Sequence, residues 1–214
     1  MSVMDFGADS DEIKSVKFKS FKGKAGETVR AGIVYEDPSK MYKGAKIHYN
    51  QRYFLCKSDD KTGKKEICCT HNYKGNKPKW RVGAVLVIYT MDDTGKKLKD
   101  WTVTPWLFSE TMFNKLKTAN SQFPLANHDV MLTCTNEEFQ NIDVQSCSAS
   151  LWTKNESFKE KVLERARPYM EELAGNIASD LTPTEIRELM GADTPGSEDA
   201  AEDVNLDDVV DGID

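Results

Sequence analysis

The 214-residue sequence lacks any run of about 18 consecutive apolar residues, the length that a membrane-spanning helix needs. Its first twelve residues contain neither a basic stretch nor an apolar one, so we expect no signal peptide. The five cysteines are an odd number, which argues against a closed set of disulfides and favours a reducing, intracellular compartment. These absences indicate a protein that neither spans a membrane nor depends on disulfides.

Recognisable catalytic motifs are missing as well. The chain contains no G-x-S-x-G or H-E-x-x-H sequence, and "GKAGET" lacks the spacing of a phosphate-binding loop. Three histidines are present, His48, His71 and His128, and the paired aspartates lie in predicted turns. We therefore expect that the protein is not an enzyme.

Positive charge is concentrated in one part of the chain. Residues 13–106 carry 21 Lys or Arg against 9 Asp or Glu, whereas residues 1–12 carry four acids and no base. From Asp193 to the C-terminus there are nine acids and no base. The net charge of −6 thus hides a basic body between acidic ends, which suggests a polyanionic partner for that body.

Short β-rich runs separated by turn signals fill most of the chain, from residues 14–21 onward, and predict a mainly β barrel or sandwich. The most apolar run, "WRVGAVLVIYT", is expected to be the central strand. The spacing of apolar residues predicts one helix after Ser109 and a second after Ser157, with a kink or restart at Pro168. A third helix is predicted from Thr182 to Gly191. We expect an acidic arm at 1–12, a β core at 13–152, a helical segment at 153–191 and a disordered acidic tail at 192–214.

Aromatic side chains accompany the basic ones, since six of the seven tyrosines and three of the four tryptophans lie between residues 13 and 106. Cations contact phosphates and ring faces stack on unpaired bases, so this mixture is typical of proteins that bind single-stranded nucleic acid. The alternative is that the rings fill the core while the lysines are solvated. The candidate nucleic-acid contacts are Tyr49, Arg52, Tyr53, Tyr73, Lys74, Lys77, Lys79, Trp80, Arg81, Lys97, Lys99 and Trp101.

One stretch of the basic region also holds potential metal ligands. Two cysteines and two histidines, His48, Cys56, Cys68 and His71, are a conceivable zinc set. If residues 46–57 form one continuous strand, however, its histidine and cysteine are roughly 26 Å apart. Cys68 and His71 also face opposite sides of a regular strand. We therefore expect no cofactor and packed or free thiols, with zinc as the alternative.

The order of these features resembles that of the single-stranded-DNA-binding, helix-destabilising proteins of T-even-like tailed phages. "VKFKSFKGKAGETVRAGIV" is similar to the opening strand pair of that family, and "KPKWRVGAVLVIYTMDDTGKKLKDW" to its basic–aromatic run and the strands that follow. "SETMFNKL" corresponds to a short helix, "HDVMLTCTNEEFQNIDVQSCSASL" to the closing strands and "NLDDVVDGID" to an acidic tail. The resemblance covers most of the chain and rests on the order of the segments.

This resemblance implies an OB-fold core that coats single-stranded DNA cooperatively, with self-association along the DNA, in the cytoplasm of the infected bacterial host. It implies a role in phage DNA replication, recombination and repair. Carried over residue by residue, it places DNA contacts at Lys77, Lys79, Trp80, Arg81 and Trp101. It also implies that the tail binds replication and recombination proteins through Asp203, Leu206, Asp207, Asp208, Asp211, Ile213 and Asp214. The chain departs from the family pattern at "EICCTHNY", which lacks the C-x-x-C step of the zinc module, and at its acidic rather than basic N-terminal arm.

Several interpretations remain open at this point. The acidic tail is a flexible polyanion tethered to a cationic groove, so it competes with DNA for that groove at high effective concentration. We therefore expect the tail to inhibit DNA binding. The alternative is that the tail only makes the protein more soluble. The main prediction is sequence-tolerant binding to single-stranded DNA. The alternatives are an RNA-binding OB-fold protein, which uses the same groove chemistry, and an adaptor whose basic face binds an acidic protein.

Overall fold

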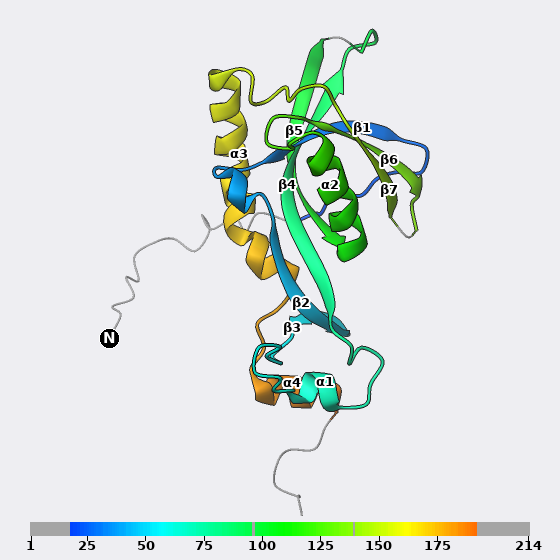
Figure 1. Cartoon of the computed structure of the whole chain (residues 1–214), viewed down its shortest axis with the longest axis vertical. Coiled ribbons are helices and arrows are strands. Elements are labelled where there is room, and N and C mark those ends of the chain that lie inside the picture. The colour runs from blue at the N-terminus through cyan, green and yellow to red at the C-terminus, as the bar shows by residue number, and fades with distance from the viewer. Residues whose placement is uncertain (1–17, 96, 139, 192–214) are drawn as a thin grey trace, which may run out of the picture.

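The computed structural model describes residues 18–95, 97–138 and 140–191 and is mainly β, as predicted (Figure 1). Seven strands form one antiparallel sheet: β1 (Thr28–Val34), β2 (Lys43–Asn50), β3 (Arg52–Leu55), β4 (Lys79–Met91), β5 (Leu98–Ser109), β6 (Val130–Asn136) and β7 (Asn141–Ser146). The helices are η1 (Pro38–Lys40), α1 (Ile67–Thr70), α2 (Glu110–Gln122), α3 (Glu156–Ile177) and α4 (Pro183–Met190).

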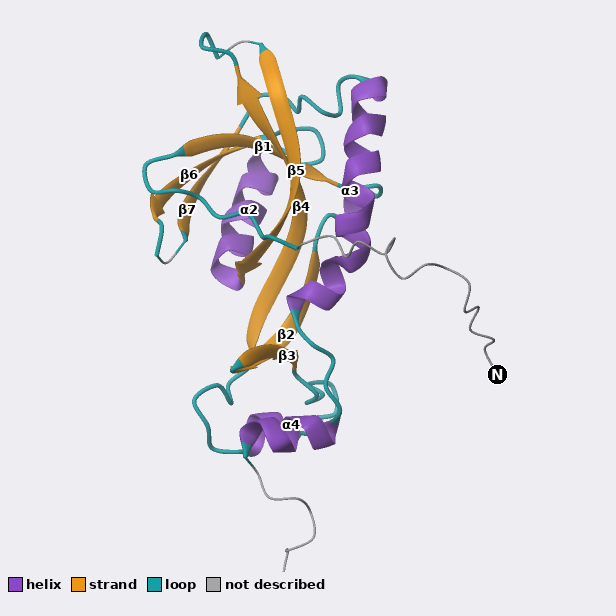
Figure 2. Ribbon diagram, turned by 180° about the vertical axis from the view of Figure 1, so that it is seen from behind, coloured by secondary structure: helices purple, strands orange, loops and turns teal. Residues whose placement is uncertain are grey.

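The apolar run predicted as the central strand is β4, and it is central in the sheet. One edge of β4 pairs with β5 along nearly its whole length. The other edge pairs first with β2 and then with β1, so these two strands follow one another along β4. Helix α2 packs on one face of the sheet and α3 on the other (Figure 2). Because both faces are covered, residues 82–87 of β4 are all buried and this part of the strand reads as a continuous apolar run.

Alternate residues of β4 enter two separate cores. Val82, Ala84 and Leu86 pack in the core on the α2 side. Val85 and Val87 pack in the core on the α3 side, together with the buried stripe of that helix. This alternation is the two-residue period of a strand, and it fixes which side chains at the ends of β4 point toward each helix.

The sheet does not close into a barrel within the described residues, because β5 pairs only with β4 and β7 only with β6. The segment 20–26 spans the gap between these two edges. Its Phe21 N–H donates to the Pro105 carbonyl of β5 at 2.7 Å, and its Gly23 N–H donates to Gln140 Oε1 beside β7 at 2.9 Å. The prediction of a strand at 14–21 was wrong over residues 18–21, which are irregular; residues 14–17 lie outside the described residues.

The two helices of the predicted segment 153–191 pack in different places. Helix α3 is capped by Asn155, two residues before the predicted Ser157, and the Asn155 side chain accepts from the Phe158 N–H. Of the predicted kink or restart at Pro168, the restart does not occur, because one helix continues through Pro168 to Ile177. Helix α4 has the predicted capping box between Thr182 and Glu185. Instead of following α3 on the sheet, α4 packs against α1.

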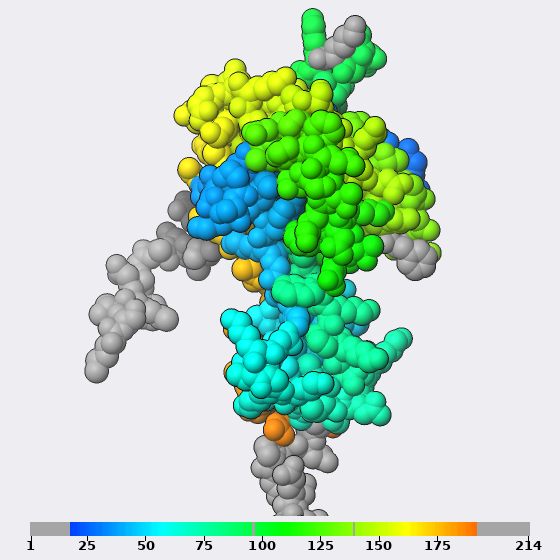
Figure 3. Space-filling model, viewed as in Figure 1, coloured from blue at the N-terminus to red at the C-terminus, as the bar shows by residue number. Residues whose placement is uncertain are grey.

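Residues 48–79 and 179–191 form a small lobe below the main body, and Figure 3 shows the narrow waist between the two parts. The Ser179 carbonyl accepts from the Leu55 N–H, which joins the segment before α4 to β3. The apolar core of the lobe is small, consisting of Phe54, Cys68, Leu181, Ile186 and Met190 with a few half-buried neighbours. A core of this size gives little hydrophobic stabilisation, so the lobe needs other interactions to stay folded.

Candidate functional site

Four side chains of the small lobe converge on one point. A ring nitrogen of His48 and the sulfurs of Cys56, Cys68 and Cys69 all lie within 4.8 Å of one another. The Cys69 sulfur is 3.5 Å from the Cys56 sulfur and 3.5 Å from His48 Nε2. Around a tetrahedral zinc ion with Zn–S bonds of about 2.3 Å, neighbouring ligand atoms lie roughly 3.8 Å apart. These four residues, named here the ligand cluster, can therefore hold a metal ion with small adjustments.

The histidine of the ligand cluster is oriented by a second hydrogen bond. His48 is 2% exposed, and its Nδ1 lies 2.8 Å from the Gly75 carbonyl oxygen. A carbonyl oxygen only accepts, so Nδ1 carries a proton and Nε2 faces the sulfurs. Metal-binding histidines commonly donate their other ring N–H to a carbonyl in this way. The same bond connects the ligand cluster to the loop that carries Lys74 and Lys77.

The cysteines of the ligand cluster differ in acidity. Burial disfavours the Cys68 thiolate, but hydrogen bonds with His48 and the Lys57 backbone outweigh burial and lower the pKa of this thiol to about 6. Burial raises the pKa of the Cys56 thiol to about 12. Without a cation, Cys68 is therefore the more readily deprotonated of the two thiols, while Cys56 stays neutral. A bound divalent cation would displace the thiol protons and supply the positive charge that further thiolates need.

The zinc ligands predicted from the sequence need one correction. His71 lies just after α1 and stacks on Tyr73, with ring centroids 6.5 Å apart, and it is not part of the ligand cluster. Cys69 takes its place. Cys68 and Cys69 both lie on the helix α1. The prediction had placed this segment on a strand, where neighbouring residues would face opposite sides of a sheet.

The predicted separation of His48 and Cys56 was also wrong, because residues 46–57 are not one strand. The chain reverses at Gln51, whose φ is 60°, and His48 pairs with Phe54 across the β2–β3 hairpin. The Cys56 N–H then donates to the Lys46 carbonyl at 2.9 Å. The hairpin therefore returns Cys56 to a position opposite Lys46, two residues along β2 from His48 and on the same face of the strand pair.

Three exposed aromatic rings and one guanidinium group lie where β2, β3 and β4 meet the waist. Tyr49, Tyr53 and Arg81 share the α3 side of these strands, whereas Trp80 lies on the opposite side of β4. These four residues are named here the aromatic surface. Tyr49 is 55% exposed, and Tyr53 and Trp80 are each 41% exposed. The two tyrosines face one another across the hairpin with ring centroids 4.9 Å apart. The Arg81 guanidinium lies 3.9 Å from the Tyr53 ring centroid and donates to the Ile177 carbonyl. This contact holds Tyr53 in place while its ring stays accessible.

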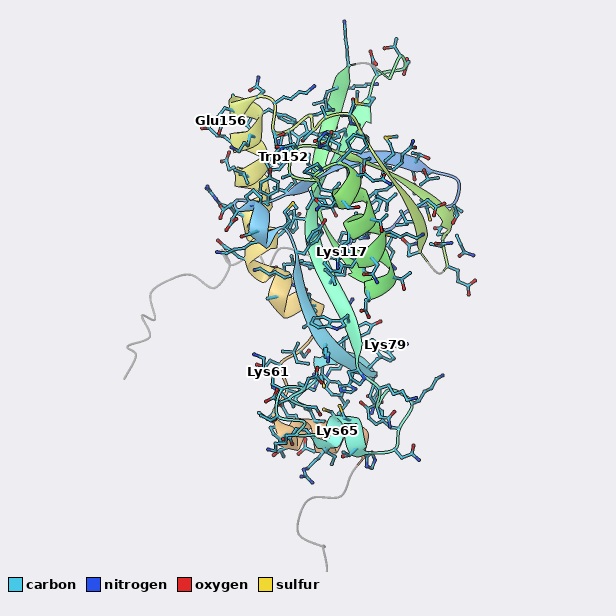
Figure 4. All side chains as sticks on the ribbon, viewed as in Figure 1. Lys61, Lys65, Lys79, Lys117, Trp152 and Glu156 are labelled. Carbon is cyan, nitrogen blue, oxygen red and sulfur yellow. The ribbon has the colours of Figure 1, made fainter. Side chains whose placement is uncertain are left out.

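Unpaired cations lie beside the aromatic surface. Lys74, Lys77 and Lys79 are exposed and form no ion pair within the described part of the chain (Figure 4 labels Lys79). Two other lysines nearby are paired, Lys46 with Asp60 and Lys57 with Asp180. Residues 43–79 as a whole carry ten Lys or Arg against three Asp or Glu. The surface around the exposed rings is therefore cationic and available to an anionic ligand.

A groove of about 370 Å³ leads from the aromatic surface into the body. Four consecutive β5 residues, 106–109, line it, and consecutive strand residues face opposite sides, so the groove follows the free edge of β5. Tyr53, Lys79 and Arg81 line one part, and Lys22 and Gln140 contribute from the gap-spanning segment and the β6–β7 turn. Lys22 and Gln140 were not predicted from the sequence, because both lie in irregular segments without a recognisable pattern.

Three predicted contacts lie elsewhere. Trp101 pairs with Tyr89, eight residues along β4 from Arg81, which corresponds to roughly 26 Å. Its ring packs on α3, with centroids 5.2 Å from Phe158 and with the Arg165 guanidinium at 4.2 Å. Lys97 and Lys99 lie near the tip of the β4–β5 hairpin, at the opposite end of the molecule from the lobe (Figure 1). The structure does not bring these residues to the aromatic surface.

The last two predicted contacts belong to the small lobe. Arg52 is exposed on the β2–β3 hairpin next to Tyr53. Tyr73 is half-buried, its hydroxyl donates to the Cys68 carbonyl at 3.1 Å, and burial raises its pKa. Arg52 faces the opposite side of β3 from Tyr53, where it interacts electrostatically with Glu185 of α4, and Tyr73 supports the lobe.

The predicted arm at 1–12 and the predicted tail contacts from Asp203 to Asp214 lie outside the described residues. Among the described helices, none has the length and apolar character required to cross a membrane. Comparisons of the chain with protein-family models, curated proteins and solved structures found no match.

Proposed function

We propose that this protein binds single-stranded DNA, with little sequence preference, across the aromatic surface and the groove. The observation that carries the proposal is the exposed Tyr49–Tyr53 pair, with Arg81 over one ring and unpaired lysines beside it. Large apolar side chains that are exposed as a group commonly mark a binding surface. Rings for stacking next to cations for phosphates are the combination that single strands require.

The arrangement favours a single strand over a duplex. In a duplex the base faces are covered by neighbouring pairs, so exposed tyrosine rings find no stacking partner. An acidic protein partner would use the lysines but has no use for two adjacent ring faces. The charge and the rings together therefore support a single-stranded nucleic acid, and the 2′-hydroxyl distinguishes RNA from the proposed DNA ligand.

Fluorescence anisotropy with DNA, RNA and duplex probes of about 12 nucleotides tests the proposal, because this length is near the upper end of known single-domain binding sites. We expect the single-stranded DNA probe to bind most tightly and Tyr53→Ala to weaken it by roughly 5- to 150-fold. The double variant Lys77→Ala/Lys79→Ala should reduce the salt dependence of binding. Lys154→Ala/Lys161→Ala, which removes the same charge from exposed positions outside the aromatic surface, is the matched control. Duplex preference, or no binding at low salt, would refute the proposal.

We further propose that the ligand cluster holds a zinc ion. Three sulfurs and one imidazole nitrogen suit Zn²⁺, and four protein ligands leave no position for a substrate, so the ion's role is structural. Because the apolar core of the lobe is small, the binding energy of such an ion would stabilise the folded lobe. Metal analysis of the purified protein tests this, and a Co²⁺-substituted sample should absorb light as a tetrahedral thiolate complex does.

We also propose that the open sheet is a variant of the OB barrel and that the protein acts in phage DNA replication, recombination and repair. Support comes from the order of the segments and from the position of the groove at the unclosed edge. OB-fold proteins likewise bind oligonucleotides on the barrel surface. Complementation of a phage that lacks its helix-destabilising protein tests the biological role.

A further inference from the structure

Two sulfurs of the ligand cluster are close enough to react with one another. Cys56 Sγ and Cys69 Sγ lie 3.5 Å apart, and an S–S bond is about 2.05 Å long, so they need to approach by about 1.5 Å. Cys56 lies in the loop that follows β3, and Cys69 lies on α1, a helix of four residues. Both are free thiols in the structure. A short helix and a loop can make so small an adjustment without any change in the sheet.

The third cysteine of the ligand cluster, Cys68, is a poorer partner in a disulfide. It precedes Cys69 directly, and adjacent Cα atoms are about 3.8 Å apart, below the usual disulfide range of about 4.4–6.8 Å. Cys68 is also 0% exposed, whereas Cys56 and Cys69 are both partly exposed and so more accessible to a dissolved oxidant. Geometry and access therefore both favour the pair Cys56–Cys69.

A peroxide is the class of oxidant that suits such a pair. One sulfur, as a thiolate, attacks a peroxide oxygen, so the O–O bond breaks, a sulfenic acid forms and hydroxide leaves. The second thiolate then attacks the sulfenic sulfur, which forms the S–S bond and releases a second hydroxide. Two thiolates and one hydrogen peroxide thus give one disulfide and two hydroxide ions. The sulfurs lose two electrons, and the peroxide gains them.

Such a disulfide would leave the ligand cluster with only His48 and Cys68 as metal ligands. A structural zinc site takes four protein ligands, so the remaining two would not retain the ion. The apolar core of the lobe is small, so loss of the ion would also loosen the lobe. His48 Nδ1 lies 2.8 Å from the Gly75 carbonyl oxygen, which links the loop that carries Lys74 and Lys77 to the same change.

We propose that Cys56 and Cys69 form a reversible oxidation site, at which a peroxide converts the two thiolates to a disulfide and the lobe releases its metal ion. Disulfides of intracellular proteins are usually transient and serve catalysis or redox sensing, and this site belongs to the second kind. The inference rests on the proposed zinc site and adds a modification that neither zinc binding nor DNA binding requires.

Treatment of the reduced, zinc-loaded protein with hydrogen peroxide tests the inference. We expect release of about one zinc ion per chain, detected with a metal-sensitive dye, together with the loss of two of the five free thiols. Peptide mapping without reduction should find Cys56 linked to Cys69. Dithiothreitol with added zinc should restore both the thiols and the bound ion. Cys147→Ser, which removes a partly exposed thiol outside the ligand cluster, is the matched control and should release zinc as the wild type does.

Three results would overturn the inference: a disulfide that contains Cys68, loss of thiols without a Cys56–Cys69 link, or a lobe that keeps its ion and all its thiols in excess peroxide. Mapping the metal-free protein in parallel separates this inference from the zinc proposal. A protein that takes up no zinc but forms the Cys56–Cys69 link refutes the zinc site and leaves the oxidation site standing. A protein that binds zinc but forms no such link refutes the oxidation site alone.

Discussion

Trp80 and Trp101 should respond to truncation in opposite ways. The sequence alone assigns both rings to DNA, because each lies beside several lysines. In the structure, Trp80 is 41% exposed and lines the groove, whereas Trp101 is half-buried against α3. Substituting each with alanine therefore separates a loss of binding from a loss of stability.

The magnitude for Trp101→Ala follows from its contacts. The variant loses an edge-to-face contact with Phe158 and a cation–π contact with Arg165, together with much of the burial of an indole ring. A fully buried tryptophan costs about 3–5 kcal/mol on truncation, so a half-buried one should cost about 2–4 kcal/mol. For a chain of this size that lowers the melting temperature by about 4–16 °C.

Trp80→Ala should leave the melting temperature nearly unchanged, because an exposed ring contributes little to the folded state. It should weaken binding of single-stranded DNA by about 1–3 kcal/mol, or 5- to 150-fold. Calorimetric melting and an anisotropy titration of both variants, below the melting temperature of each, provide the comparison. The reasoning fails if Trp101→Ala binds DNA poorly at full stability, or if Trp80→Ala melts as early as Trp101→Ala.

The remaining predictions concern the lobe and the tail. Chelation or Cys69→Ser should expose the amides of residues 48–79 to hydrogen exchange while α2 stays protected, whereas Cys147→Ser, outside the ligand cluster, should have no such effect. Gly75→Ala should weaken DNA binding, because a Cβ there lies 2.1 Å from the Tyr49 carbonyl oxygen and displaces the loop; Gly175→Ala, whose Cβ meets nothing within 4 Å, should not. Truncation after Gly191 leaves 29 bases against 26 acids and should tighten binding most at low salt, and a scrambled tail of equal charge tests whether sequence order matters.

Patterns that reflect local chemistry were readable from the sequence. The apolar run of β4 is continuous because helices cover both faces, and its position as the central strand was predicted correctly. Helix α4 begins and ends at the predicted residues because a capping box and a left-handed glycine are local signals. The sequence also singled out Tyr49, Tyr53 and Trp80, since an aromatic ring among lysines is visible without knowledge of the fold, and all three rings are exposed in the structure.

Features that depend on tertiary placement were not readable. The reversal at Gln51 gave no signal, because glutamine rarely adopts a positive φ, and the histidine–cysteine distance was therefore misjudged. The burial of Trp101 depends on Phe158 and Arg165, which lie more than fifty residues later in the chain. A basic–aromatic pattern gives no information on which rings a distant helix will cover.

Photo-crosslinking of a 5-bromodeoxyuridine oligonucleotide, followed by identification of the attached residues, tests the central claim most directly. Bromouracil reacts with an aromatic side chain that stacks on it, so the crosslinked positions report the path of the bases. The proposed surface predicts adducts at Tyr49, Tyr53 or Trp80, which are lost at high salt and in competition with unlabelled single strands. Adducts confined to Trp101 or to the β4–β5 hairpin would contradict the claim that the aromatic surface binds the strand.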